Sequence, residues 1–110
     1  MTKVLFSGWD GGYIFRCEGH AGAAEKGRDI VCSAVSILSY TLAQSAINLY
    51  NEGLLSEEPI TNVKDGFVEI KIKPRADTKD GVSRTIAVVQ TGYLLLSHSY
   101  PDFVSVISTI

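Results

Sequence analysis

The sequence is poor in the residues that build disulfide frameworks and metal centres. It holds two cysteines, two histidines and three prolines among 110 residues. Two cysteines cannot form the several bridges of a small secreted scaffold, and no cysteines and histidines stand at paired zinc-ligand spacings. We therefore predict free thiols, no metal site and no cofactor.

Charge is also sparse and nearly balanced. Ten basic and twelve acidic residues leave a formal net charge of −2. Nucleic-acid-binding domains usually carry a basic surface, so we expect no direct nucleic-acid partner to be required. No apolar run reaches the roughly 18 to 20 residues of a membrane span, and no signal peptide opens the chain. From these absences we expect no membrane partner and a cytoplasmic location.

The patterns that are present predict one α+β domain over residues 1–110. We expect the order ββαββαβ in two layers, a mixed or antiparallel sheet with two helices packed on one face. Asp-Gly dipeptides at 10–11 and 65–66 mark two hairpin turns. The expected strands are 3–8, 13–20, 58–64, 67–73 and 103–110, and the expected helices are 30–52 and 78 or 80 to about 99.

The stretch from Gly19 to Ser36 carries the candidate chemistry. Asp29 is a favoured helix N-cap, because its carboxylate accepts amide hydrogens of the first turn. Cys32 then lies in that turn, where the positive end of the helix dipole favours a thiolate. His20 stands at the other end of a short loop and would complete a thiolate–imidazolium pair, the minimum for cysteine nucleophilic catalysis.

Other interpretations fit the same residues. A single cysteine on a helix is more often a small core residue than a nucleophile. A glycine-containing loop before a helix can instead hold a phosphate or an RNA backbone, although neither G-x-G-x-x-G nor a P-loop pattern is present. The residues alone therefore leave open a cysteine protease, a ribosome- or RNA-associated binding module, and another thiol-dependent amidase or acyltransferase.

The second cysteine and the second histidine have structural explanations. Cys17 falls in the alternating pattern of strand 13–20, where a buried thiol is expected. His98 falls in the last turn of the second predicted helix, where the helix dipole favours a cation. We therefore predict that neither is catalytic.

The loop between His20 and Asp29 is rich in small residues. It contains Gly22 and Gly27, follows Gly19, and has little to bury. Because binding residues often lie on loops held by rigid scaffolds, we predict that residues 21–28 form a flexible flap over a bound peptide. An ordinary surface loop is the alternative.

The two predicted helices carry more apolar surface than one small sheet should cover. Helix 30–52 carries large apolar groups outside its main stripe, which predicts cover on a second side and favours a homodimer. The first hairpin carries four aromatic residues, which we expect mostly in the core, with one or two candidates for an apolar substrate groove: Phe6, Trp9, Tyr13 and Phe15.

Three runs in this stretch, GH at 19–20, GRDIVC at 27–32 and AVS at 34–36, resemble the signature of the ribosomal-processing cysteine protease Prp (YsxB-like) family. Length and element order fit that family over the whole chain. The resemblance implies a Cys32 nucleophile, a His20 partner, and supporting roles for Asp29 and Ser36. Ser33, where alanine is expected, is the one visible departure.

The resemblance also implies an activity. Members of this family remove the N-terminal extension of large-subunit ribosomal protein number twenty-seven. The implied enzyme is a cysteine endopeptidase that acts through a Cys–His dyad and a thioester acyl-enzyme. Its partners would be the ribosomal protein precursor, as peptide substrate, and a second copy of the chain in a homodimer.

Overall fold

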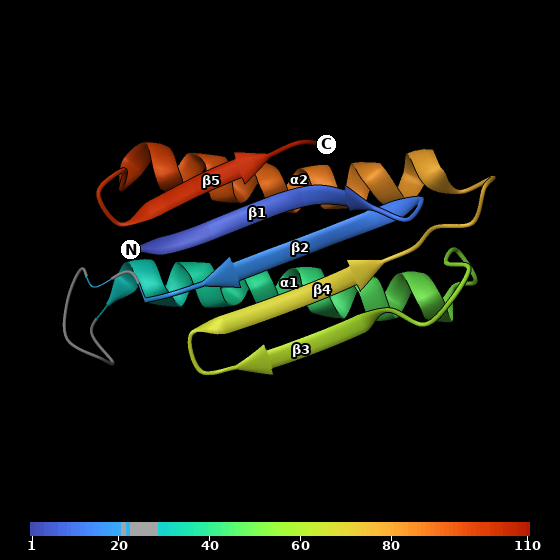
Figure 1. The fold of residues 1–110 in the computed structure, drawn as a ribbon, viewed down its shortest axis with the longest axis horizontal. Coiled ribbons are helices and arrows are strands. Elements are labelled where there is room, and N and C mark those ends of the chain that lie inside the picture. The colour runs from blue at the N-terminus through green and yellow to red at the C-terminus, as the bar shows by residue number, and fades with distance from the viewer. Residues whose placement is uncertain (21, 23–28) are drawn as a thin grey trace.

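The structure, a computed structural model, describes residues 1–20, 22 and 29–110. A five-stranded sheet forms one layer and two helices cover one of its faces (Figure 1). The order ββαββαβ and the α+β class are confirmed. The elements are β1 Thr2–Trp9, β2 Gly12–Glu18, α1 Ile30–Asn51, β3 Ile60–Lys64, β4 Phe67–Ile72, α2 Lys79–Ser99 and β5 Val104–Ser108.

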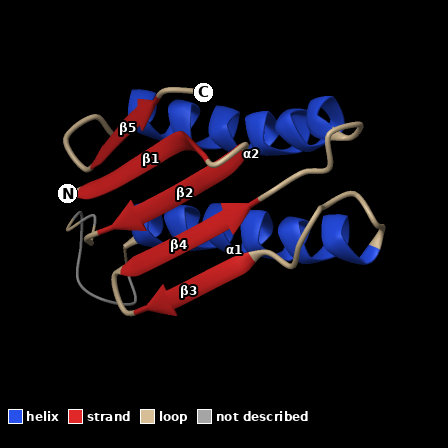
Figure 2. Cartoon of the chain, turned by 45° about the vertical axis from the view of Figure 1, so that its right-hand side comes forward, coloured by secondary structure: helices blue, strands red, loops and turns tan. Residues whose placement is uncertain are grey.

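The sheet has the strand order β3-β4-β2-β1-β5 and is mixed. Strand β1 pairs with β5 in parallel, and every other pairing in this sheet is antiparallel. The two hairpins predicted from Asp-Gly dipeptides join through β2 and β4, so the turn after β3 lies next to the end of β2. Figure 2 shows both helices behind the same face of the sheet.

Several element ends differ from the sequence prediction. Strand β3 begins at Ile60 rather than at residue 58, because Pro59 has no N–H to donate to the sheet. Strand β5 begins at Val104, since the N–H of Phe103 donates to Tyr100 O in the preceding turn. These differences change element lengths by a few residues and leave the topology as predicted.

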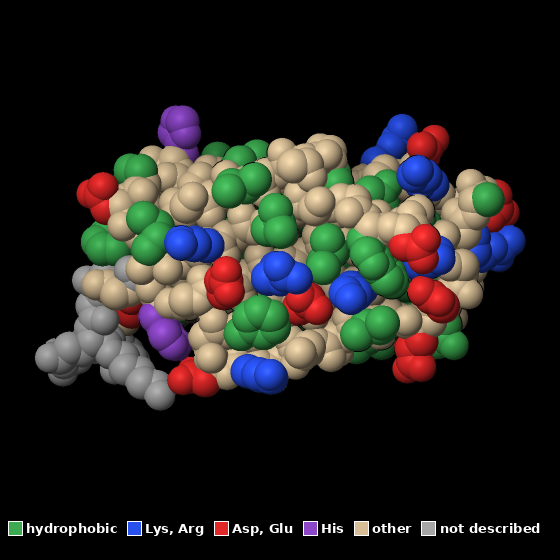
Figure 3. All heavy atoms as spheres, viewed as in Figure 1, with side chains coloured by type: hydrophobic (Ala, Val, Ile, Leu, Met, Phe, Trp, Pro, Cys, Tyr) green, Lys and Arg blue, Asp and Glu red, His purple; other side chains and the backbone are tan. Residues whose placement is uncertain are grey.

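The core is built from the alternating residues of the strands and the inner stripes of the helices. Phe6 and Phe15 face the helices and meet Tyr93 of α2, with ring centroids 5.1 to 6.0 Å apart. Trp9 lies on the opposite face, where Lys71 Nζ approaches its ring centroid to 4.8 Å. That open face carries charged side chains of both signs (Figure 3).

Helix α1 has 22 residues and no charged side chain. By length and composition alone it would pass as a membrane-spanning helix, so the expectation that no segment qualifies was wrong. Here one stripe of the helix, including Val31, Leu42 and Ala46, is buried against the sheet and α2. The opposite stripe exposes Ile37 and Ile47 to solvent.

The two helices approach each other closely at Gly92. A Cβ at this position would lie 2.7 Å from Leu38 Cδ2 of α1. The missing side chain therefore makes room for Leu38, which offsets the lower helix propensity of glycine in α2.

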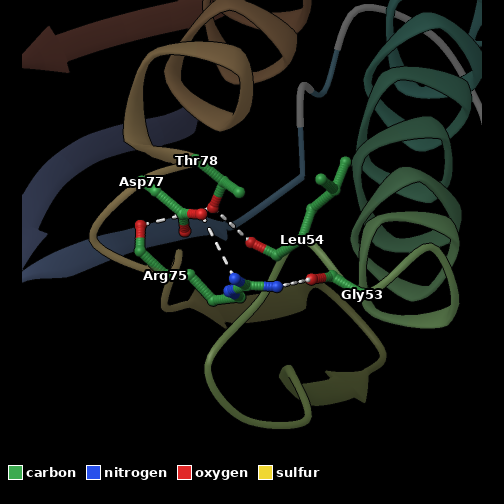
Figure 4. A network of polar contacts seen from close by, with 5 residues as sticks. All are labelled: Gly53, Leu54, Arg75, Asp77 and Thr78. Carbon is green, nitrogen blue, oxygen red and sulfur yellow. Dashed lines mark hydrogen bonds and ion pairs between the residues drawn. The ribbon is translucent and has the colours of Figure 1, made fainter.

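A polar network ties the end of α1 to the start of α2 (Figure 4). Arg75 Nη1 donates to Gly53 O at 3.1 Å, and Thr78 Oγ1 donates to Leu54 O at 2.6 Å. Thr78 precedes α2, but its hydroxyl is used in this contact and makes no cap. The network fixes the two helices at the end of the molecule opposite the N-terminus of α1.

Candidate active site

The start of α1 is set by Asp29. Its Oδ1 accepts a hydrogen bond from the Cys32 N–H at 3.0 Å, and its main-chain oxygen accepts one from Ser33 Oγ at 3.2 Å. The carboxyl group is almost fully buried, since only 6 % of Asp29 is exposed. Asp29 is therefore the N-cap, and it places the half-buried thiol of Cys32 in the first helical turn.

Cys32 and His20 line the same pocket, whose volume is about 960 Å³. Among the described residues, four parts of the chain line this pocket: the start of β1, the end of β2 and the residues just after it, the first turns of α1, and the β3–β4 hairpin. Ser36, one helical turn beyond Cys32, and Gly22 also line it. The pocket thus collects most of the candidate residues named from the sequence.

His20 is held at its main chain on two sides. The neighbouring Gly19 N–H donates to Gly66 O at 2.8 Å, and the Met1 amino group donates to His20 O at 2.8 Å. Gly19 has a φ of +95°, and a Cβ there would lie 2.4 Å from Met1 O, so only glycine fits. The backbone at the entrance of the loop is therefore tightly specified.

The imidazole of His20 lies over the turn between β3 and β4. Its Nε2 is 4.0 Å from Asp65 Oδ2, and the side chain is 60 % exposed. No hydrogen bond joins His20 to Cys32, both of which are described residues. The two side chains line the same pocket without a hydrogen bond between them.

Cys17 lies deeper in the pocket, among α1 and α2. Burial raises the pKa of its thiol to about 11, although hydrogen bonds with Ser39 and Tyr93 oppose this rise. A negative charge on Cys32 acts in the same direction as burial. Cys17 is therefore protonated at neutral pH, which suits the structural role predicted for it.

The floor of the pocket is a buried polar contact between the helices. The Tyr93 hydroxyl donates to Val35 O at 3.1 Å and shares a hydrogen bond with Ser39 Oγ. Burial raises the pKa of Tyr93. The contact ties α2 to α1 one turn beyond Cys32.

The remaining sequence candidates divide into three groups. His98 is exposed in the last turn of α2 and lies outside the pocket. Gly27 and the proposed flap at residues 21–28, apart from Gly22, lie outside the described residues. None of the four aromatic residues of the first hairpin lines the pocket, and two of them, Phe6 and Phe15, are core residues.

The apolar surface of the pocket instead comes from α1 and the second hairpin: Ile37, Tyr40, Val63 and Phe67. Sequence reasoning identified Ile37 and Tyr40 only as apolar residues outside the main stripe of the helix. Their spacing of three residues puts them on one flank of α1. No local signal in the sequence brings β3 and β4 beside that flank.

Comparison with known proteins decides the family. The model of the family described as cysteine protease Prp matches residues 1–105. The chain belongs to the cysteine protease Prp family. A ribosomal processing cysteine protease Prp of Mycoplasma pneumoniae is 33 % identical over 87 residues, which cover 79 % of this chain and 78 % of that protein. The chain is thus a cysteine protease, a peptide hydrolase of the ribosomal-processing family.

Solved structures share the Prp fold. The S. aureus Prp in complex with a covalently linked product peptide has a TM-score of 0.69 and 22 % identity, covering 99 % of this chain and 100 % of that one. A Streptococcus mutans protein has a TM-score of 0.69 and 27 % identity, covering 98 % and 93 %. These likenesses confirm the arrangement of five strands and two helices.

The different surroundings of the two thiols predict selective alkylation. At pH 7.5 a thiol with a pKa of about 11 is ionised in about three molecules in ten thousand, so Cys17 should react slowly with iodoacetamide in the folded protein. Cys32, half-buried in the pocket wall, should be labelled first. Peptide mapping by mass spectrometry checks this order, and prior labelling of Cys17 in the folded protein would contradict it.

Proposed function

We propose that this protease removes the N-terminal extension of large-subunit ribosomal protein number twenty-seven, with Cys32 as nucleophile and His20 as general acid and base. One observation carries the proposal: the Asp29-capped helix presents the Cys32 thiol to a pocket that His20 also lines. The name of the Mycoplasma pneumoniae relative, a ribosomal processing cysteine protease, supports the substrate class.

In the proposed reaction the Cys32 thiolate attacks the scissile carbonyl carbon. The peptide C–N bond then breaks, the leaving amine takes a proton from the His20 imidazolium, and a thioester remains on Cys32. Water then gives a proton to His20 while its oxygen attacks the thioester carbon. The C–S bond breaks, the acyl group leaves as a carboxylic acid, and the Cys32 thiolate and the His20 imidazolium are restored. Because catalytic hydrogen bonds often form only around a bound substrate, the separate resting positions of the two side chains are compatible with this sequence.

The positive end of the α1 dipole lies beside Cys32, where it would stabilise the oxyanion that forms on the scissile carbonyl. The first amides of this helix are the natural candidates for oxyanion donors. The Cys32 N–H, however, already donates to Asp29. It becomes an oxyanion donor only if the Asp29 carboxylate turns away, so we assign Asp29 the cap in the resting enzyme.

Removal of either dyad member should stop turnover without unfolding the protein. Cys32→Ala and Cys32→Ser should abolish cleavage of the extended ribosomal protein, and His20→Ala should lower kcat about 10²- to 10⁴-fold. His98→Ala is the matched control and should cleave at the wild-type rate, because His98 lies outside the pocket. Gel assays with purified substrate measure these rates. Wild-type turnover by Cys32→Ala, or its loss in His98→Ala, would refute the assignment.

The apolar wall of the pocket should select bulky apolar residues before the scissile bond. Tyr40 is 54 % exposed and lines the pocket, whereas Tyr50 is 42 % exposed on the same helix and does not. Burying a large side chain against Tyr40 contributes about 1.5 kcal/mol or more, so Tyr40→Ala should lower kcat/KM about tenfold. Tyr50→Ala should leave it unchanged.

The same loss should follow from the substrate side. A peptide with alanine in place of the bulky residues before the cut should be cleaved at least tenfold less efficiently, and the added loss in Tyr40→Ala should then be small. If the parent and the substituted peptide are cleaved equally well, the apolar wall does not select substrate.

We further propose a homodimer through the outer face of the helical layer. Helix α1 has no charged side chain, and α2 has none between Arg84 and His98. Ile47, Val88 and Leu95 are exposed there, and a second copy would cover them without removing a charge from water.

Sedimentation should give about twice the 11.9 kDa of one chain, and Leu95→Glu should dissociate the dimer, because it places a charge in the interface. A concentration-independent monomer would contradict the dimer.

A further inference from the structure

The turn between β3 and β4 lies directly against His20. Gly66 has a φ of +70°, a left-handed conformation that favours glycine. A Cβ on Gly66 would lie 2.8 Å from His20 Nε2, and 3.3 and 3.4 Å from two further ring atoms. The imidazole therefore occupies space that any other residue at position 66 would fill.

The main chain couples this turn to the histidine as well. Gly66 O accepts the N–H of Gly19, the residue just before His20, at 2.8 Å. This bond continues the β2–β4 ladder, in which Cys17 faces Val68 and Glu18 faces Phe67. The turn and the base of the His20 side chain thus belong to one rigid unit, the sheet.

Asp65, the other residue of the turn, brings a carboxylate to the imidazole. Its Oδ2 lies 4.0 Å from His20 Nε2, at the limit of an ion pair. From the sequence, Asp29 is expected to cap the first helix, and the resemblance to the Prp family implies a supporting role in the site. In the structure Asp29 Oδ1 accepts the Cys32 N–H, which is the capping contact.

We propose that Asp65 and Gly66 are positioning residues for His20. Gly66 leaves open the space that the Nε2 edge of the ring occupies, and Asp65 attracts the imidazolium through Nε2, which leaves Nδ1 for proton transfer. Together they restrict the ring to one side of the pocket, so that less orientational freedom is lost when it protonates the leaving amine. This inference rests on the proposed function, in which His20 is the general acid.

The chain contains its own matched control for Gly66. The first hairpin also turns at an Asp-Gly dipeptide, Asp10-Gly11, and Gly11 has a φ of +77° with nothing within 4 Å of its Cβ position. Gly11→Ala and Gly66→Ala therefore each place a Cβ on the second residue of a two-residue hairpin turn at a similar positive φ, although the two turns differ at the preceding aspartate, because Asp10 has a φ of +44°. Gly66→Ala alone pushes on an imidazole.

The experiment compares two substrates that share one acyl peptide, a peptide amide and an activated ester. The amide needs a proton on its leaving amine, whereas the ester does not. In kcat/KM, which covers only the steps up to acylation and not the His20-assisted hydrolysis of the thioester, a displaced general acid therefore slows only the amide. A loss of binding or of folded structure slows both. The ratio of kcat/KM for the two substrates thus isolates the position of His20.

We expect Gly66→Ala to lower kcat/KM for the amide about ten- to hundredfold and to leave the ester within about threefold. Gly11→Ala should match the wild type on both substrates while losing similar thermal stability. Asp65 is 85 % exposed, so Asp65→Asn should lower the amide reaction only about two- to fivefold, with Asp10→Asn as its control. Asp65→Glu should recover part of that loss.

Equal losses on amide and ester in Gly66→Ala, or a Gly66→Ala enzyme no worse than Gly11→Ala, would overturn the inference. If Gly66→Ala fails to fold, Asp65→Asn decides, and wild-type amide cleavage by that variant would overturn the role of Asp65. The His20→Ala variant separates a failure of this inference from a failure of the proposed function. If His20→Ala cleaves the amide at the wild-type rate, His20 is not the general acid and the proposed dyad is wrong.

Discussion

The hydrogen bond from the Cys32 N–H to Asp29 Oδ1 is the contact on which the site depends. It determines the residue at which α1 begins, and therefore the side of the helix on which the thiol lies. A start one residue earlier or later would turn Cys32 by about 100° around the helix axis. An N-cap contributes only about 1 kcal/mol to stability, so its importance here lies in direction more than in the free energy of folding.

A second constraint comes from strand register. The pairing of β2 with β4 puts the Asp65-Gly66 turn beside Gly19 and His20. A slip of one residue would move every side chain of β4 to the other face of the sheet and bury Glu69 and Lys71 in place of Ile70 and Ile72. Burial of Ile70 and Ile72 therefore fixes the register of β4 against β2, and that register places the Asp65-Gly66 turn beside the His20 imidazole.

Much of the fold follows from local patterns in the sequence. Alternating residues and Asp-Gly dipeptides predict the hairpins, and the apolar period of α1 with Asp29 before it predicts both the helix and its cap. Cys32 and His20 became candidates for the same reason, since they flank that cap and its loop, and the structure places both at one pocket. The similarity to the Prp family then added the activity, which local patterns alone left open.

The parts that sequence missed depend on long-range packing. The apolar wall of the pocket beside Ile37 and Tyr40 forms only when β3 and β4 lie next to α1. No local pattern in residues 60–68 predicts that this hairpin packs beside that helix. The four aromatics of the first hairpin were expected mostly in the core, with one or two as groove candidates, and local patterns could not say which. Phe6 and Phe15 are core residues because Tyr93, 78 residues after Phe15 in the chain, packs over both. Gly66 read as a turn residue, because the contact that gives it a second role comes from His20 on another strand.

The central claim is that the thiol placed by the Asp29 cap forms the covalent intermediate. It is tested most directly by acid-quenching the enzyme during turnover of the extended ribosomal protein and mapping the acylated residue by mass spectrometry. The account predicts the mass of the cleaved N-terminal extension as a thioester on Cys32. An acyl group on Cys17, or steady turnover with no acylated cysteine even at the earliest times, would contradict it.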